Sequence, residues 1–199
     1  MDWKRLPTDM EFLGTFHGRL PEAALPEVAF VGRSNVGKSS AITAMLNRRK
    51  AARVSGTPGR TQAVNLFRIS DRVCFADLPG YGFAKAPENV RKAWGRLVRR
   101  YLFKREALAL VVQLVDARHP AKKADIEMID LLSEADVPFI VVATKIDRVK
   151  RSKQQAALST LAKGLGMDTE QLIPFSSTDK IGQDLVWAVL LDVVDEFEL

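Results

Sequence analysis

Residues 28–47 read VAFVGRSNVGKSSAITAMLN, in which the short apolar run Val28–Val31 precedes a glycine-rich turn and the helical pattern Lys38–Asn47. The turn, Gly32–Ser39, matches G-x-x-x-x-G-K-[ST] at every fixed position, in the strand–loop–helix context that this motif requires. Average glycine usage makes a chance match expected in roughly one such chain in a hundred. The stretch therefore predicts a phosphate-binding loop between a strand and a helix.

The residue types of this loop suit an anion. Glycine lets backbone N–H groups close around a phosphate, and the N-terminus of the following helix favours negative charge. Lys38 is expected to bridge phosphate oxygens, and the Ser39 hydroxyl is expected to bind Mg²⁺. The predicted nucleotide-binding residues of the loop are Gly32, Arg33, Ser34, Asn35, Val36, Gly37, Lys38, Ser39 and Ser40.

Strand-like and helical segments alternate along the chain, which predicts a three-layer α/β fold with a mainly parallel sheet and helices on both faces. The expected strands are Val28–Val31, Val64–Ile69, Val73–Ala76, Leu108–Val115, Phe139–Ala143 and Leu172–Phe175. The expected helices are Lys38–Asn47, Asn89–Lys104, Lys122–Ala135, Lys153–Leu165 and Gly182–Phe197. A tight turn at Ser70-Asp71 indicates one antiparallel hairpin, and Glu11–Phe16 is a candidate edge strand. We expect residues 1–27 to form an extension packed on one domain, residues 28–199.

The segment Asp77-Leu78-Pro79-Gly80 follows the strand-like run Val73–Ala76. Ligands of open α/β sheets bind at the carboxyl ends of the strands. Asp77 is therefore expected in the Mg²⁺ shell, and the Gly80 N–H is expected to meet a γ-phosphate. Alone, this tetrapeptide is as often an ordinary turn. Its position after a hairpin strand, downstream of the phosphate loop, favours the ligand-binding role.

Two further segments, TKID at residues 144–147 and Ser176-Ser177, also follow expected strands. A carboxylate can accept two hydrogen bonds from guanine N1 and N2, which adenine does not offer, and a lysine stem can cover the base plane. The backbone N–H groups of a serine pair suit a base carbonyl. Each segment is a weak signal alone, but the ordered set predicts guanine recognition. The expected base contacts are Thr144, Lys145, Asp147, Ser176 and Ser177.

Composition and charge limit the classes of protein to which this chain can belong. The 199 residues, 47% hydrophobic and 27% charged, fit one globular domain, and a net charge of +6 favours an anionic partner. The single cysteine, Cys74, allows no internal disulfide and offers no zinc-ligand spacing, which fits a reducing compartment. Apolar stretches are too short for a membrane span. We expect a cytoplasmic protein with no membrane partner, and a monomer by default.

Together, GRSNVGKSS, PGRTQ at residues 58–62, DLPGYG at residues 77–82 and TKID resemble translation-factor-type small GTPases, and more closely the EngB family, also called YihA or YsxC. The likeness covers nearly the whole chain. It implies a P-loop GTPase domain that binds GTP and GDP with Mg²⁺ and acts on the large ribosomal subunit or its precursor. By position, Gly59 contacts the nucleotide, and Thr61 is the switch threonine that reaches Mg²⁺ and the γ-phosphate. Thr57 is the competing candidate for the switch threonine.

Two positions bear on catalysis. Tyr81 follows DLPG where Ras-like enzymes place the glutamine that orients water, so we expect slow intrinsic hydrolysis. Asn35 resembles the residue of GTPases that use K⁺ as part of their catalytic charge, and a role only in shaping the loop is the alternative. Equal GTPase rates in KCl and NaCl would exclude the K⁺ role. The expected catalytic residues are Lys38, Thr61, Gly80 and Asn35.

The expected helix Asn89–Lys104 has an apolar face and an opposite basic face. Its like-charge spacings each cost about 0.2–0.5 kcal/mol. Arg96, Arg99 and Arg100 have no acidic residue three or four positions away, so stability does not explain the pattern. A solvated basic face is the commoner meaning of such a run. Because the helix follows a loop that would respond to the γ-phosphate, contact with ribosomal RNA is the sharper interpretation. The expected contacts are Lys85, Lys92, Arg96, Arg99 and Arg100.

Two functions of other classes stay open at this point. The chain is also compatible with an RNA- or protein-binding switch in which GTP hydrolysis is incidental. A metabolic phosphoryl-transfer enzyme with the same phosphate loop is the second rival. The guanine motif, and the lack of a recognisable acceptor-binding lid in the sequence, count against that enzyme.

Overall fold

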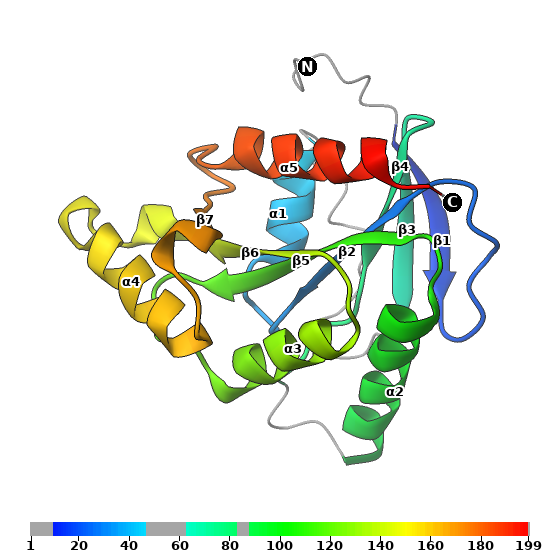
Figure 1. Cartoon of the computed structure of the whole chain (residues 1–199), viewed down its shortest axis with the longest axis horizontal. Helices are drawn as coiled ribbons and strands as arrows, with labels where there is room; N and C mark the ends of the chain where they lie inside the picture. Colours follow the sequence, from blue (N-terminus) through cyan, green and yellow to red (C-terminus); the bar gives the residue numbers. More distant parts are fainter. Residues whose placement is uncertain (1–9, 47–62, 83–87, 199) are drawn as a thin grey trace.

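The computed structural model describes residues 10–46, 63–82 and 88–198, which form one sheet with helices on both faces (Figure 1). The strands are β1 (Met10–Phe16), β2 (Glu27–Gly32), β3 (Val64–Ile69), β4 (Val73–Asp77), β5 (Leu108–Asp116), β6 (Phe139–Thr144) and β7 (Leu172–Pro174). The α-helices are α1 (Lys38–Met45), α2 (Glu88–Lys104), α3 (Lys123–Glu134), α4 (Gln154–Leu165) and α5 (Gln183–Glu196). Short 3₁₀ turns are η3 (Ile146–Arg148), η4 (Arg151–Lys153) and η5 (Thr169–Gln171). The sequence predicted each strand and α-helix to within two residues at its described ends.

The strand order in the sheet is β1-β3-β4-β2-β5-β6-β7. Strands β4, β2, β5, β6 and β7 run parallel, so their carboxyl ends meet along one edge. Strands β3 and β4 form the expected antiparallel hairpin, and β1 pairs antiparallel with β3 as the edge strand. The predicted α/β fold is therefore confirmed, with β1 adding a second antiparallel pairing.

Side chains alternate between the two faces of the central strand β2, and each face is covered by a different set of helices. Val28 and Phe30 belong to the cluster beneath α1 and α5, whereas Ala29 and Val31 belong to the cluster beneath α2 and α3. A further cluster packs α4 against β6. Because both faces are covered, β2 is buried along its whole length, as a parallel strand requires.

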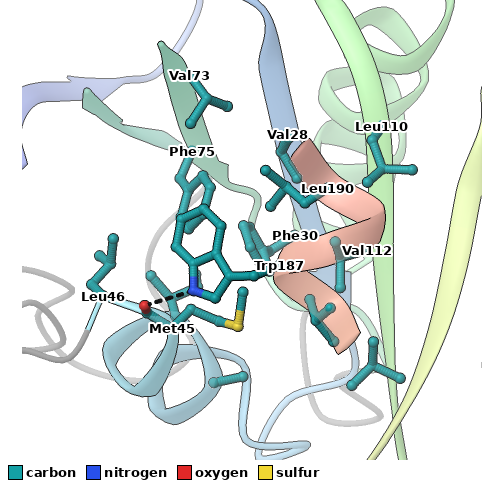
Figure 2. Packing of buried hydrophobic residues seen from close by; sticks show 14 of the residues in the cluster. Val28, Phe30, Met45, Leu46, Val73, Phe75, Leu110, Val112, Trp187 and Leu190 are labelled. Carbon is teal, nitrogen blue, oxygen red and sulfur yellow. Dashed lines mark hydrogen bonds between the residues drawn. The ribbon is translucent and has the colours of Figure 1, made fainter. Parts of the chain in front are cut away.

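Trp187 of α5 is the largest aromatic group of the first cluster (Figure 2). Its ring lies 5.6 Å from the ring of Phe75, and its Nε1–H donates to the Met45 carbonyl at 3.1 Å. The hydrogen bond satisfies the buried indole nitrogen and joins α5 to the end of α1. Trp187, which is 3% exposed, is therefore a core residue.

A buried ionic group lies at the opposite end of β2 from the phosphate loop. Glu27 is 2% exposed and accepts hydrogen bonds from the Arg105 guanidinium, with Nε at 2.8 Å, and from the Tyr101 hydroxyl. Cys74 is the neighbour of Glu27 across the β2–β4 pair, and burial raises the pKa of its thiol to about 12. The thiol is therefore protonated at neutral pH, and Cys74 packs as a small buried hydrophobe.

Among the helices that the structure describes, none has the length and apolar character needed to cross a membrane.

Replacing Arg105 with methionine should lower the free energy of unfolding by about 3 kcal/mol, because the buried Glu27 carboxylate loses its counter-charge. Arg68→Met is the matched control: its pair with Glu11 is exposed on both sides, and such pairs contribute at most about 1 kcal/mol. Urea unfolding monitored by circular dichroism measures both changes. Equal losses for the two variants would contradict the assignment of Glu27–Arg105 as a buried anchor.

Candidate functional site

The predicted loops converge at the carboxyl edge of the parallel strands. The phosphate loop leaves β2, DLPG continues from β4, TKID follows β6, and the serine pair follows β7. Hydrogen bonds between backbone groups and side chains of neighbouring loops tie this edge together. The site is therefore built by the sheet topology, not by any one loop.

Two positions of the phosphate loop require glycine. A Cβ on Gly32 would lie 2.8 Å from Val36 Cγ1 and 3.0 Å from the Leu114 carbonyl oxygen. Gly37 has φ of 106°, in the left-handed region, and caps the N-terminus of α1. Asn35 also has a positive φ, 64°, which asparagine tolerates better than most residues. These conformations form the tight turn that carries Lys38 into the first turn of α1.

Lys38 of the phosphate loop forms an ion pair with Asp77 at the end of β4. Both side chains are largely buried, 13% and 7% exposed, and Asn65 Nδ2 lies 3.4 Å from the second Asp77 oxygen. Neither sequence segment alone indicated that these two residues touch. The contact brings the predicted phosphate-binding cation and the predicted metal-binding carboxylate to one point.

The oxygen donors at this point fit Mg²⁺. The carboxylate of Asp77 and the hydroxyl-bearing Ser39, in the first turn of α1, belong to the segments that meet there. Mg²⁺ in phosphate-transfer sites takes one or two protein oxygens, with phosphate and water completing the shell. Among the residues that the structure describes, no group of three or more His, Cys, Asp or Glu side chains is placed to hold a metal ion.

The DLPG segment lies directly along the phosphate loop. The Tyr81 N–H donates to the Gly32 carbonyl at 3.2 Å, and the Ser34 N–H donates to the Tyr81 carbonyl at 3.0 Å. A Cβ on Gly80 would lie 3.3 Å from Ser34 N, so a larger residue would require the phosphate loop to shift by a few tenths of an ångström. The contacts place Gly80 beside the phosphate loop, as its predicted role requires.

The Tyr81 side chain is buried between the loops and α3. Its hydroxyl donates to Asp125 Oδ1 at 3.1 Å, and Asp125 Oδ2 lies 3.2 Å from Arg33 Nε. Burial, followed by the charge of Asp125, raises the pKa of Tyr81. Gln113 Nε2 donates to the Asp125 carbonyl at 2.9 Å. The Tyr81 phenol is thus protonated, and its hydrogen is donated to Asp125. The sequence did not reveal this contact, because no linear motif marks Asp125.

Trp94 of α2 joins this segment to the basic helix. Its Nε1–H donates to the Pro79 carbonyl at 2.8 Å, and its ring lies 5.7 Å from the Tyr81 ring. Trp94 is partly buried and packs against the core beneath α2. The hydrogen bond adds a role that the sequence did not reveal, a direct link from DLPG to α2.

At the other end of the phosphate loop, Thr144 and Lys145 hold the loop from the side of β6. The Thr144 hydroxyl lies 2.7 Å from the Val36 carbonyl oxygen and 2.9 Å from the Val115 carbonyl oxygen. The Lys145 ammonium donates to the Asn35 carbonyl and to Asp116 Oδ2, the latter at 2.9 Å. The Thr144 hydroxyl and the Lys145 ammonium therefore fasten the phosphate loop to the sheet.

Asp147 and the serine pair lie on adjacent loops. The Ile146 N–H donates to the Phe175 carbonyl at 3.2 Å, which joins η3 to the end of β7. Ser176 differs from expectation: its N–H donates to the Ile181 carbonyl at 3.0 Å, and its hydroxyl accepts backbone hydrogen bonds within its own turn. The Ser177 N–H has no such bond to the described backbone, so Ser177 is the better donor for a base carbonyl.

The basic face of α2 is partly neutralised. Arg99 forms a two-bond ion pair with Glu134 of α3 and stacks over Phe103, 4.5 Å from the ring centre. Lys92 pairs with Glu88 at 2.8 Å. Arg96 and Arg100 are exposed, and no ion pair to the described residues is found for either. The partner of Arg99 was missed because it comes from another helix.

Several predicted positions lie outside the described residues: Thr57, Gly59, Thr61 and Lys85.

Comparison with known proteins identifies the family. Residues 27–145 match the family model described as "50S ribosome-binding GTPase". The chain is 46% identical to a probable GTP-binding protein EngB of Streptococcus gordonii, over 88% of this chain and 90% of that protein. The corresponding protein of a Streptococcus pyogenes M18 strain is also 46% identical, over 87% and 88%.

Solved structures share the fold. A crystal structure of a probable GTP-binding protein EngB has a TM-score of 0.70 at 23% identity, covering 86% of this chain and all of that chain. Era in complex with MgGDPNP and part of 16S ribosomal RNA has a TM-score of 0.65 at 21% identity, over 89% of this chain and 59% of Era. Motif order, strand topology and the extended sequence identity agree, and the chain belongs to the EngB family of P-loop GTP-binding proteins.

Proposed function

We propose that this EngB-family GTP-binding protein hydrolyses GTP slowly with Mg²⁺ and acts as a nucleotide-gated factor in assembly of the large ribosomal subunit. The observation that best supports nucleotide binding is the ion pair between Lys38 and Asp77 beside the phosphate loop. The ribosomal part is supported by the description of the matching family and by the exposed basic residues of α2. The proposed gate is the loop between DLPG and α2.

Catalysis in this scheme is electrostatic. Lys38 and the N–H groups of the phosphate loop would stabilise negative charge on the transferring phosphoryl group, and the Gly80 N–H would meet the γ-phosphate. Ser39, Asp77 and, as a proposed third ligand, Thr61 would hold Mg²⁺, which would supply positive charge to the phosphate oxygens. K⁺ beside Asn35 is a second proposed charge, tested by comparing GTPase rates in KCl and NaCl.

The surroundings of Tyr81 support a slow intrinsic rate. Its hydroxyl is committed to Asp125 and its ring is packed against Trp94, so the position that carries a water-orienting glutamine in Ras-like enzymes has no free polar group. Among the described residues that contact the DLPG segment, we find no replacement for that glutamine. We therefore propose that rapid hydrolysis requires the ribosomal partner, a bound cation, or both.

Trp94 gives the proposed gate a physical route. If gain or loss of the γ-phosphate moves the DLPG segment, the Trp94–Pro79 hydrogen bond would transmit that movement to α2. Of the RNA contacts predicted on α2, Lys92 and Arg99 already have acidic partners, whereas no ion pair to the described residues is found for Arg96 and Arg100, so these two would be presented to RNA. A monomer in the cytoplasm remains our expectation. Pairing of β1 with β3 supports residues 10–16 as part of the proposed extension.

An RNA- or protein-binding switch with incidental hydrolysis is the second candidate, which the engaged Tyr81 favours. Stimulation of GTP turnover by large ribosomal subunits would favour the enzyme, whereas no stimulation would favour the binding switch.

Asp147→Asn should change the base preference from guanine to xanthine. Loss of the carboxylate removes the acceptor for guanine N1 and N2, while the asparagine amide can donate to the xanthine 2-carbonyl. Competition of GDP and XDP for a fluorescent nucleotide measures the preference. We expect the affinity for GDP to fall by roughly a hundredfold and the affinity for XDP to rise, because a site with unpaired polar groups discriminates strongly between bases. Unchanged preference would remove Asp147 from the base site.

The ribosomal proposal predicts nucleotide-dependent co-sedimentation with purified large subunits. At near-physiological salt, the protein should be retained with a non-hydrolysable GTP analogue and released with GDP. An Arg96→Gln/Arg100→Gln variant should bind less tightly and lower the slope of log affinity against log salt by roughly one to two, as two phosphate contacts are lost.

The matched control is Lys163→Gln/Lys180→Gln, which removes the same charge from exposed positions on α4 and before α5. It should leave both retention and slope unchanged. Equal, salt-sensitive binding with both nucleotides would contradict the proposed gate.

A further inference from the structure

Asp116, at the carboxyl end of β5, binds two cations at once. It is 6% exposed and lies opposite Thr144 in the β5–β6 register. Its Oδ1 accepts from Arg118 Nε at 2.9 Å and from the Arg118 N–H at 3.1 Å, while Oδ2 accepts from Arg118 Nη2 at 2.7 Å. Lys145 Nζ donates to the same Oδ2 at 2.9 Å. No sequence motif singled out Asp116 or Arg118.

The second cation, Lys145, reaches the phosphate loop. Its ammonium donates to the Asn35 carbonyl as well as to Asp116, so it is held between the loop and β5. A Cβ on Gly37 would lie 3.6 Å from Lys145 Cε, which shows that the lysine stem runs against the phosphate-loop backbone. The side chain is only 19% exposed. An ammonium in this setting needs a counter-charge, which Asp116 supplies.

The carboxylate itself is kept charged. Burial opposes ionisation of Asp116, but hydrogen bonds from Arg118 and then Lys145 outweigh it and lower the pKa of this carboxyl well below its usual range. Arg118 matters here because it satisfies the oxygen that Lys145 does not use. At neutral pH, Lys145 therefore faces an anion.

We infer that Asp116 is a positioning residue for the nucleotide: it fixes the ammonium of Lys145 against the Asn35 carbonyl, so that the lysine stem forms a wall for the base. The inference rests on the proposed guanine-nucleotide site. Asp116 touches no base edge in this account, because its oxygens are occupied by Arg118 and Lys145. Its effect on binding is therefore independent of which groups the base carries at N1 and C2.

The test compares Asp116→Asn with the unmodified protein in titrations of GDP and IDP, the latter lacking the exocyclic amine of guanine. Because a charge-assisted contact is replaced by a neutral one, the affinities for GDP and IDP should both fall by the same factor, roughly tenfold. Asp130→Asn, an exposed aspartate on α3, is the matched control and should change neither affinity. A loss confined to GDP, or no loss, would overturn the inference.

A double-mutant cycle separates positioning from a general structural effect. The Lys145→Met background keeps the length of the side chain and removes the ammonium. In that background, Asp116→Asn should lower the affinity for GDP by less than about twofold. A further tenfold loss in that background would mean that Asp116 acts through another group. Urea unfolding of each variant records stability separately. An unmodified protein that binds neither GDP nor IDP would refute the proposed site itself, an outcome distinct from failure of the inference.

If Asp116→Asn does not fold, the Arg118→Gln variant provides an alternative test. Lys145 then becomes the sole cation on the carboxylate, so GDP affinity should stay within about twofold of the unmodified value. A tenfold loss would identify Arg118, not Lys145, as the group that Asp116 positions, and would overturn the inference.

Discussion

The phosphate loop is held on two sides by the neighbouring strands' loops, and the rest of the site depends on this constraint. On one side, backbone hydrogen bonds between Gly32, Ser34 and Tyr81 join it to DLPG. On the other side, Thr144 and Lys145 reach its carbonyls. Both contacts exist because β4 and β6 run parallel to β2 and β5 and end at the same edge. The sheet thus sets the loop before any ligand contributes.

Charges at this edge are arranged in pairs, each joining two chain segments. Lys38 and Asp77 link the phosphate loop to β4, and the Lys145 ammonium with Asp116 links TKID to β5. Fixed dipoles and charges of this kind stabilise developing charge without reorganising, which suits phosphoryl transfer. The Glu27–Arg105 pair, at the far end of β2, serves the fold and not the site. Buried charge therefore has two different uses in this protein.

The fold and the loops of the site could be predicted from the sequence, because strand–loop–helix motifs are local and their order fixes which sheet edge they share. The phosphate loop, DLPG and TKID all lie where this reasoning put them. Contacts between distant segments could not be predicted. Asp125 looks like an ordinary residue of the first turn of α3, and Glu134 like a surface acid, until packing brings them to Tyr81 and Arg99.

The central claim is that Lys38, fixed opposite Asp77, holds the phosphates of a guanine nucleotide. Titration of a fluorescent GTP analogue into Lys38→Ala, with the exposed Lys163→Ala as control, tests it most directly. The account predicts that Lys38→Ala loses tight binding, by at least roughly a hundredfold, since a buried charge contact to phosphate is removed, while the control keeps its affinity. Affinity equal to that of the unmodified protein in a folded Lys38→Ala variant would contradict it.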